Sequence, residues 1–118
     1  GSTQVGSISS SSTTTYYNTS SDYRLKNTIE PMTGALAKVS ALNPVTYKWN
    51  IDDSYGEGFI AHELQEVVPQ AVNGVKDAVD ENGKSKYQGV DTNVLVPLLT
   101  AALQEALARI EVLESKVK

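Results

Sequence analysis

The strongest pattern of apolar positions lies near the C-terminus, where hydrophobic residues recur at steps of three and four. This spacing predicts a long helix over about residues 93–118. If these residues take the a and d positions of a heptad, Arg109 falls at g and Glu114 at e, five residues later. That is the spacing of an ion pair between parallel helices of a coiled coil. The seam residues would be Val96, Leu99, Leu103, Ala106, Ile110, Leu113 and Val117.

Two interpretations of this helix stay open. It forms the seam of a self-associating coiled coil, or it packs on its own domain as an amphipathic helix, which gives much the same pattern. Ala102 and Leu107 widen the stripe beyond the seam, so we expect the first half to pack on the domain and the second half on partners. Pro97 is expected to distort the first turn without breaking the helix.

Between residues 22 and 92 the apolar patterns are short, and they predict an α+β unit with a small β-sheet and short helices. The expected elements are a helix that starts at Pro31 with an apolar face of Leu36, Val39, Ala41 and Leu42, a strand over 45–50, a turn-rich loop over 52–58, a strand over 59–61, a short helix over 63–68, and a hairpin that turns at Glu81-Asn82-Gly83. The expected core residues are Tyr47, Trp49, Phe59 and Ile60.

Composition changes the picture at the N-terminal end. Residues 1–21 carry no charged side chain, and 12 of the first 20 residues are Ser or Thr. Such a segment has too little apolar surface to offset its ordering entropy, as in a disordered linker. Residues 13–17 are good strand formers, so the end of a β-structured region completed by other chains is the alternative. We place a boundary near Ser20 to Asp22, and Gly1-Ser2 suggests the scar of a removed tag.

The residue counts exclude several kinds of chemistry. The chain has no Cys and one His, so disulfides, thiol nucleophiles and zinc–thiolate sites are excluded, and we expect no metal or cofactor. A net charge of −4 argues against nucleic-acid binding. No apolar run approaches the roughly 20 residues that cross a bilayer, so we expect no membrane span. His62 is expected to be structural or on the surface, with Glu63 beside it as an accessory candidate.

Ser21 and Lys26 are a candidate nucleophile and base, provided that the amine is neutral. An ordinary lysine has a pKa of about 10.4, so neutrality requires desolvation or a nearby cation, which Arg24 could supply. Five residues apart, the two side chains point about 140° apart on a helix and to opposite faces on a strand. The pair can therefore meet only across a turn or between chains.

The segment Ser21-Asp22-Tyr23-Arg24-Leu25-Lys26 resembles the Ser-Asp-x-Arg-x-Lys signature of the self-cleaving C-terminal intramolecular chaperone domains of phage tailspikes and tail fibres, the endosialidase-type S74 peptidase family. The resemblance continues in the same order through residues 42–49, 58–63, 68–69, 87–90 and 98–105, and covers about residues 20–118. Two positions depart from the family pattern: His62 stands where Gln is usual, and Pro97 interrupts the entry to the helix.

This resemblance implies a function. Ser21 would be the nucleophile, Lys26 the base, and Asp22 and Arg24 would order the site. The cut would fall at the Ser20–Ser21 bond, with Ser21–Asp22 as the alternative. Residues 1–20 would end the upstream fibre, and residues 21–118 would be the released chaperone.

The resemblance also implies partners and a place of action. The domain would form a homotrimer through its long helix, in a coiled coil or helical bundle, and would contact the upstream fibre region of its own chain. It would act in the host cytoplasm during virion assembly, leaving the fibre in the virion tail and the released domain outside it. Two alternatives are a non-catalytic trimerisation module and the related domain of a membrane-anchored transcription factor.

Overall fold

The computed structural model describes residues 6–13 and 15–117. Gly1-Ser2, the predicted strand former Thr14 and the predicted helix end at Lys118 lie outside these residues. The chain divides into two compact units, which we call the first unit (Gly1–Pro31) and the second unit (Met32–Lys118). Each unit is described by itself below.

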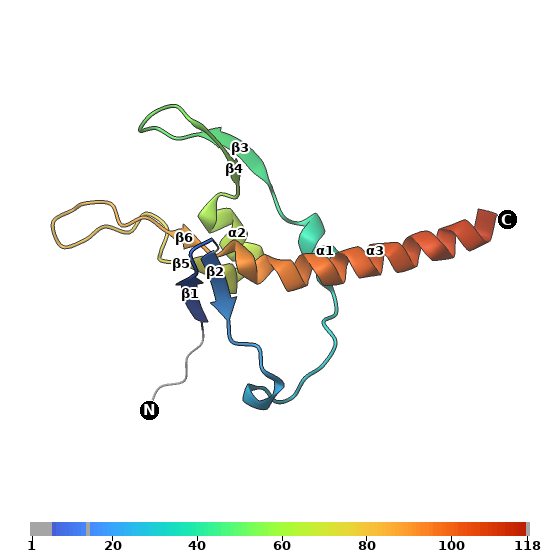
Figure 1. The fold of residues 1–118 in the computed structure, drawn as a ribbon. Coiled ribbons are helices and arrows are strands. Elements are labelled where there is room, and N and C mark those ends of the chain that lie inside the picture. The colour runs from blue at the N-terminus through green and yellow to red at the C-terminus, as the bar shows by residue number, and fades with distance from the viewer. Residues whose placement is uncertain (1–5, 14, 118) are drawn as a thin grey trace. The chain divides into compact units, whose positions relative to one another are not determined.

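The first unit holds one hairpin and one turn (Figure 1). Strands β1 (Gly6–Ser10) and β2 (Thr15–Thr19) pair antiparallel, with Gly6 opposite Thr19 and Ser10 opposite Thr15. A 3-10 turn, η1 (Tyr23–Leu25), follows. The described part of the Ser/Thr-rich segment therefore contains paired strands, as its β-forming residues suggested, but the two strands pair with each other and not with strands of other chains.

The second unit contains three helices: α1 (Ala35–Ser40), α2 (Ala61–Val67) and α3 (Leu95–Val117). Two short 3-10 turns also occur: η2 (Pro69–Ala71) precedes β5 (Val72–Asn73), and η3 (Thr92–Val94) precedes α3. The expected start of the first helix at Pro31 is wrong. That helix begins at Ala35, because Gly34 takes a left-handed conformation with φ 73° and sets the chain direction there.

Two small antiparallel sheets complete the second unit. One pairs β3 (Val45–Lys48) with β4 (Tyr55–Gly58), and the other pairs β5 (Val72–Asn73) with β6 (Gly89–Val90). The alternation predicted for this strand is confirmed over β3, since Val45 and Tyr47 are half-buried whereas Thr46 and Lys48 are exposed.

The second strand of that hairpin was predicted in the wrong place. We expected a loop over 52–58 and a strand over 59–61, but β4 occupies Tyr55–Gly58 and α2 starts at Ala61. Glycine content suggested a loop, whereas Gly56 and Gly58 lie against the Tyr47 ring across the hairpin, where a side chain at Gly56 would overlap that ring. The two glycines therefore allow the Tyr47 ring to approach the backbone of a strand, although glycines in a sequence usually indicate a loop.

Residues 74–88 form a long arm between β5 and β6. Its turn confirms the predicted turn at Glu81-Asn82-Gly83, but the strands expected over 75–80 and 84–90 are wrong, since the arm has one isolated bridge, between Val79 and Ser85. Asp80 N–H donates to the Lys84 carbonyl at 2.8 Å, and Gly83 N–H donates to the Asp80 carbonyl at 3.0 Å. Gly83 has φ 79°, the left-handed conformation that a glycine supplies at the end of a three-residue hairpin loop. Figure 1 shows this arm projecting from the body of the second unit.

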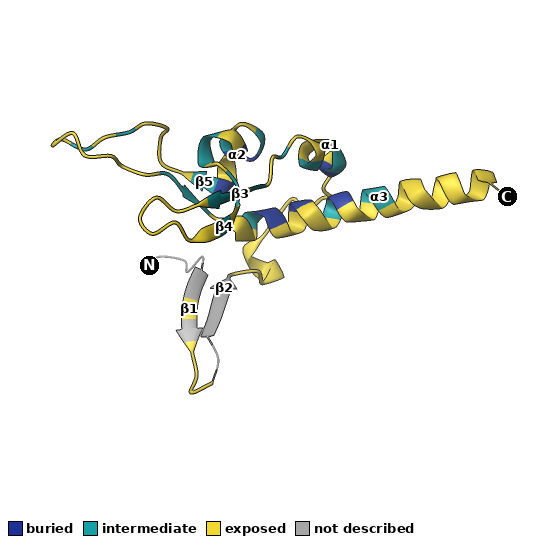
Figure 2. Ribbon diagram, turned by 90° about the horizontal axis from the view of Figure 1, so that it is seen from above, coloured by how far each residue is buried: buried dark blue, intermediate teal, exposed yellow. Residues whose placement is uncertain are grey.

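The core of the second unit lies between α1, α2, η2 and the first half of α3 (Figure 2). Its buried residues are Ala35, Leu64, Val68, Ala71, Leu95, Leu98 and Ala102. The expected core is therefore wrong in two residues: Trp49 is 52% exposed and Ile60 is 39% exposed. Phe59 is half-buried against the core, and Tyr47 is half-buried on β3. A two-stranded hairpin has no further strand to cover its aromatic side chains.

Helix α3 uses two different faces. Leu95, Leu98 and Ala102 are buried against the second unit, whereas Leu103 and Ile110 of the heptad stripe are 62% and 49% exposed. Figure 2 shows the C-terminal half of α3 extending, exposed, beyond the rest of its unit. The first half of the helix therefore packs on the domain, as expected, and its packing leaves the heptad stripe uncovered.

The start of α3 is regular in spite of its proline. The helix runs without interruption from Leu95, so Pro97 lies in its first turn, where backbone N–H groups have no partner within the helix.

By length and composition alone, the helical stretch Thr92–Val117 is apolar enough to cross a membrane, contrary to our expectation. Its burial of Leu95 and Leu98 on one side is, however, the pattern of an amphipathic helix in a globular unit.

Candidate functional site

The structure brings Ser21 and Lys26 together in the first unit. Lys26 Nζ donates a hydrogen bond to Ser21 Oγ at 2.7 Å. As the five-residue spacing requires, they meet across a turn and not along a helix or a strand. Ser20, whose carbonyl would be attacked in the proposed cut, directly precedes Ser21.

Turn η1 sets the distance between these two side chains. Asp22 caps the turn, because its Oδ1 accepts from the Arg24 backbone N–H at 2.9 Å. Two backbone hydrogen bonds close the turn: Leu25 N–H donates to the Asp22 carbonyl at 3.1 Å, and Lys26 N–H donates to the Tyr23 carbonyl at 3.2 Å. A tight turn with an acidic cap therefore folds the chain back by the right length for Lys26 to reach Ser21.

Asp22 and Arg24 form a two-pronged ion pair across the same turn. Arg24 Nε donates to Asp22 Oδ1 and Arg24 Nη2 donates to Asp22 Oδ2, both at 2.9 Å. The side-chain and backbone hydrogen bonds from Arg24 lower the pKa of Asp22, and the same ion pair raises the pKa of Arg24. Because the folded state lowers the pKa of Asp22, the ion pair supports the turn at pH values above the ordinary pKa of 3.8, and this support is lost as the pH falls from that value through the lowered pKa.

This ion pair changes the role expected of Arg24. Its positive charge is compensated by Asp22, so it cannot serve as the uncompensated cation that would favour a neutral Lys26. Ser21 and Lys26 are themselves exposed in the single chain.

Residues 21–73 match the model of the family described as chaperone of endosialidase, and the match begins at Ser21. The chain is also 36% identical, over 103 residues and 82% of its length, to the long tail fibre protein Gp37 of Enterobacteria phage K3 and to that of phage T2. It is 36% identical over 107 residues to a probable tail fibre protein of Escherichia phage Phieco32. By this match, residues 21–73 of the chain belong to the chaperone-of-endosialidase family.

The chain is similar to only a small part of those relatives. It spans 8% and 7% of the two long tail fibre proteins and 13% of the probable tail fibre protein. The family match covers both the turn with Ser21 and Lys26 and the first half of the second unit, through β5.

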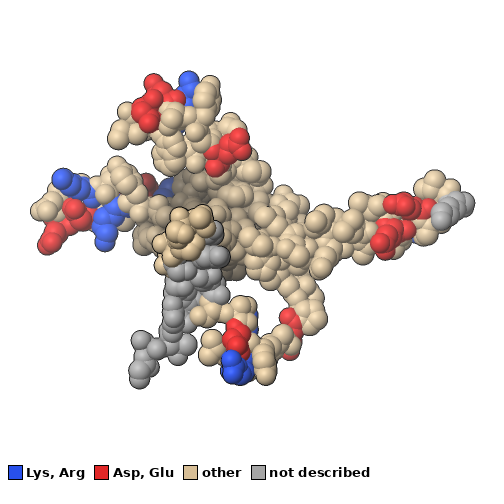
Figure 3. Space-filling view, in the orientation of Figure 1, with Lys and Arg blue, Asp and Glu red and all other residues tan. Residues whose placement is uncertain are grey.

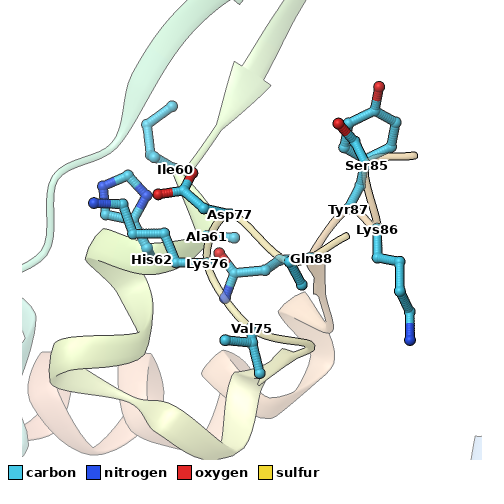
Figure 4. Close-up of a pocket in the computed structure, with 11 residues that line it drawn as sticks. Ile60, Ala61, His62, Val75, Lys76, Asp77, Ser85, Lys86, Tyr87 and Gln88 are labelled. Atoms are coloured by element: carbon cyan, nitrogen blue, oxygen red, sulfur yellow. The ribbon is translucent and has the colours of Figure 1, made fainter. Parts of the chain in front are cut away.

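The accessory candidates His62 and Glu63 belong to the second unit. Glu63 Oε1 accepts from Asn43 Nδ2 at 3.1 Å, which ties α2 to the segment before β3. His62 lines a cavity of about 430 Å³ between the start of α2 and the arm (Figure 4). Ser85 lies in the wall of the same cavity.

Sequence reasoning missed one residue that organises the second unit. Glu105 Oε2 accepts from the Leu36 backbone N–H at 3.1 Å, so a side chain of α3 caps the N-terminus of α1. Gly34, at the cap position of α1, has no side chain that could do this. The other carboxylate oxygen of this residue, Glu105 Oε1, lies 3.8 Å from Arg109 Nη2. A glycine before the helix indicates that the acceptor for its first N–H groups comes from another part of the chain. The sequence does not tell which residue supplies that acceptor.

Proposed function

We propose that this chain is the self-cleaving C-terminal intramolecular chaperone of a phage tail fibre or tailspike, which trimerises the fibre, assists its folding and then releases itself. The observation that carries the proposal is the 2.7 Å contact between Lys26 Nζ and Ser21 Oγ across η1. Family membership and the tail fibre relatives support the chaperone part.

The proposed reaction is a shift of one acyl group followed by hydrolysis. Ser21 Oγ attacks the carbonyl carbon of Ser20 while neutral Lys26 accepts the hydroxyl proton. The bond from that carbon to the Ser21 nitrogen breaks, and the nitrogen takes a proton and becomes a free amine. Water then hydrolyses the ester between Ser20 and Ser21 Oγ, which leaves a carboxylate on Ser20 and restores the Ser21 hydroxyl.

No substrate pocket is needed for such a reaction. The attacking oxygen and the attacked carbonyl belong to adjacent residues, so positioning alone supplies several kcal/mol of the barrier reduction. The enzyme acts once, on its own chain, and has no activity on added peptides. Asp22 and Arg24 are positioning residues, because they hold the turn and touch neither reacting atom.

Trimerisation would use the exposed stripe of α3. The isolated second unit leaves Leu103, Ile110 and Leu113 between 49% and 62% exposed, and a parallel bundle would bury them. Arg109, which lies 3.8 Å from Glu105 in its own helix, would then reach Glu114 of a neighbouring chain. A trimeric clamp raises the local concentration of the three upstream chain ends.

The physical role of such a clamp follows from the nature of β-structured fibres. Interwound strands have high contact order and exposed edges, so they fold slowly and aggregate easily without help. Cleavage after folding removes the clamp, and the fibre is then held by its own unfolding barrier. The upstream region would remain in the virion tail after assembly in the host cytoplasm, whereas the cut domain would be lost.

Mass spectrometry of freshly expressed protein tests the catalytic part. The parent chain should give two fragments divided at Ser20–Ser21, and a cut at Ser21–Asp22 would show as a shift of one serine. Ser21→Ala and Lys26→Ala should leave a folded, uncut chain, while the neighbouring control Ser20→Ala should still cut. Because the base must be neutral, the cleavage rate should rise with pH.

The exposure of Ser21 and Lys26 in one chain favours a second candidate, a trimerisation module whose serine and lysine are idle. If Ser21→Ala cleaves as fast as the parent, or if the parent is never cut, this second function replaces the first. The tail fibre relatives support the phage assignment over the related domain of a membrane-anchored transcription factor.

A further inference from the structure

A groove of about 620 Å³ lies beside the β3–β4 hairpin in the second unit. Tyr47 and Trp49 of the hairpin segment and Phe59 and Ile60 before α2 line one part of it, and β6 lines another. The Tyr47 and Trp49 rings meet edge to face, with centroids 5.1 Å apart. Trp49 is nevertheless 52% exposed.

This aromatic groove lies beside the core, against which Phe59 and Val90 of its lining pack. The four residues expected to form the core line this groove, and none of them is among the buried residues. The buried core itself contains Leu64 as its one fully buried large side chain among the described residues. Trp49 and Ile60 thus leave apolar surface exposed in the groove, where a contact with another chain would cover it.

The lining of the groove combines apolar and charged side chains. Lys48 and Glu57 line it beside the rings of Tyr47 and Trp49. On the face drawn in Figure 3, charged side chains of this unit lie on the hairpin, on the arm and near the end of α3, and its body is largely without them. Because charged residues are depleted from the centres of protein interfaces, the apolar part of the groove is the part that an apolar segment would contact.

We propose that this groove is an interface that receives an apolar segment of a second copy of this chain. The inference rests on the proposed trimer but concerns a surface outside the helical seam. Val90 and Thr92 line the groove, and the chain passes from them directly into α3, whose first seam residue is Val96. Copies held in parallel by the seam would have their bodies side by side at this end of the helix.

Threefold symmetry makes the groove and its occupant two different patches of the same chain. A threefold ring is closed by head-to-tail interfaces, so each copy must offer both a hollow and a protrusion. The second unit carries suitable protrusions outside the groove: Ile51 is 92% exposed and Tyr87 is 90% exposed. The chain thus supplies both halves of such an interface without any other partner.

Trp49 makes the test direct, because it is the single tryptophan of the chain. Its fluorescence and its quenching by acrylamide are measured in the full chain carrying Ser21→Ala, at concentrations where light scattering shows the trimer. The matched monomer carries Leu103→Asp and Ile110→Asp in addition, which charge the seam and leave the groove residues intact. We expect bluer emission and several-fold weaker quenching in the trimer than in the monomer.

The outcomes separate this inference from the proposed function. A trimer whose Trp49 is quenched as strongly as in the monomer overturns the groove interface and leaves the helical seam standing. A chain that is monomeric at every concentration overturns both. Tyr16→Ser with Tyr17→Ser should not change the quenching of the trimer, and stronger quenching would show that the upstream segment fills the groove instead.

A second variant measures the contribution of the groove to assembly. Trp49→Ala should raise the dissociation constant of the trimer by at least about tenfold, as expected for a buried aromatic anchor. The far-UV circular dichroism of the monomer should stay the same, because Trp49 lies outside the core. An unchanged dissociation constant would overturn the proposal.

Discussion

Replacing one leucine on each face of α3 separates folding of the protomer from assembly of the copies. Leu98 is 6% exposed and belongs to the core, whereas Leu103, five residues later, is 62% exposed. Leu98→Ala should lower the free energy of unfolding by about 2–5 kcal/mol, because it removes buried methyl groups and leaves a cavity. Leu103→Ala should change the free energy of unfolding of an isolated protomer by less than about 1 kcal/mol.

The cost of Leu103→Ala should appear in assembly. Full burial of a leucine side chain is worth about 1.5–3 kcal/mol. Since 62% of Leu103 remains to be covered by other copies, each chain loses about 1–2 kcal/mol and the trimer about 3–6 kcal/mol. Each 1.4 kcal/mol is a factor of ten, so the dissociation constant of the trimer should rise by about 10²–10⁴.

Sedimentation velocity over a concentration series measures assembly, and urea unfolding followed by circular dichroism measures stability. Val112→Ala is the control, because Val112 is 52% exposed but lies outside the heptad seam. Leu98→Ala should lower the urea midpoint at every concentration, and Leu103→Ala mainly at those where the parent is assembled. A Leu103→Ala protein that assembles as tightly as the Val112→Ala control would refute the seam.

Two further substitutions test local features of the second unit. Gly56→Ala should lower the free energy of unfolding by about 1–3 kcal/mol, because the new methyl group overlaps the Tyr47 ring. Gly58→Ala is the control, because its methyl group would lie 3.6 Å from Tyr47 Oη and should lower the melting temperature clearly less. Equal losses of melting temperature in the two variants would contradict this packing. Glu105→Ala should lower the free energy of unfolding by about 1 kcal/mol and speed hydrogen exchange at the Leu36 amide, because the cap of α1 is lost. Glu105→Gln keeps an acceptor oxygen and should preserve most of the protection from exchange. Unchanged exchange in Glu105→Ala would show that the cap does not stabilise α1.

The sequence by itself determined the features that depend on near neighbours along the chain. Periodicity located α3 to within a few residues, alternation located β3, and Asn82-Gly83 located the turn of the arm. The spacing of Ser21 and Lys26 excluded a regular helix or strand between them, and the structure has a turn there. Each of these rests on backbone geometry over a few residues, which the local sequence specifies.

Only the tertiary structure decided which apolar residues are covered. Trp49 was expected in the core, yet it is 52% exposed, whereas Leu98, which lies outside the predicted heptad seam, is buried in the core. The periodicity of α3 also could not tell which of two overlapping stripes meets the domain, since both repeat at three and four residues. The cap of α1 by Glu105 joins residues 69 positions apart. Burial and such contacts depend on how separate elements meet in space, and no short stretch of sequence contains that information.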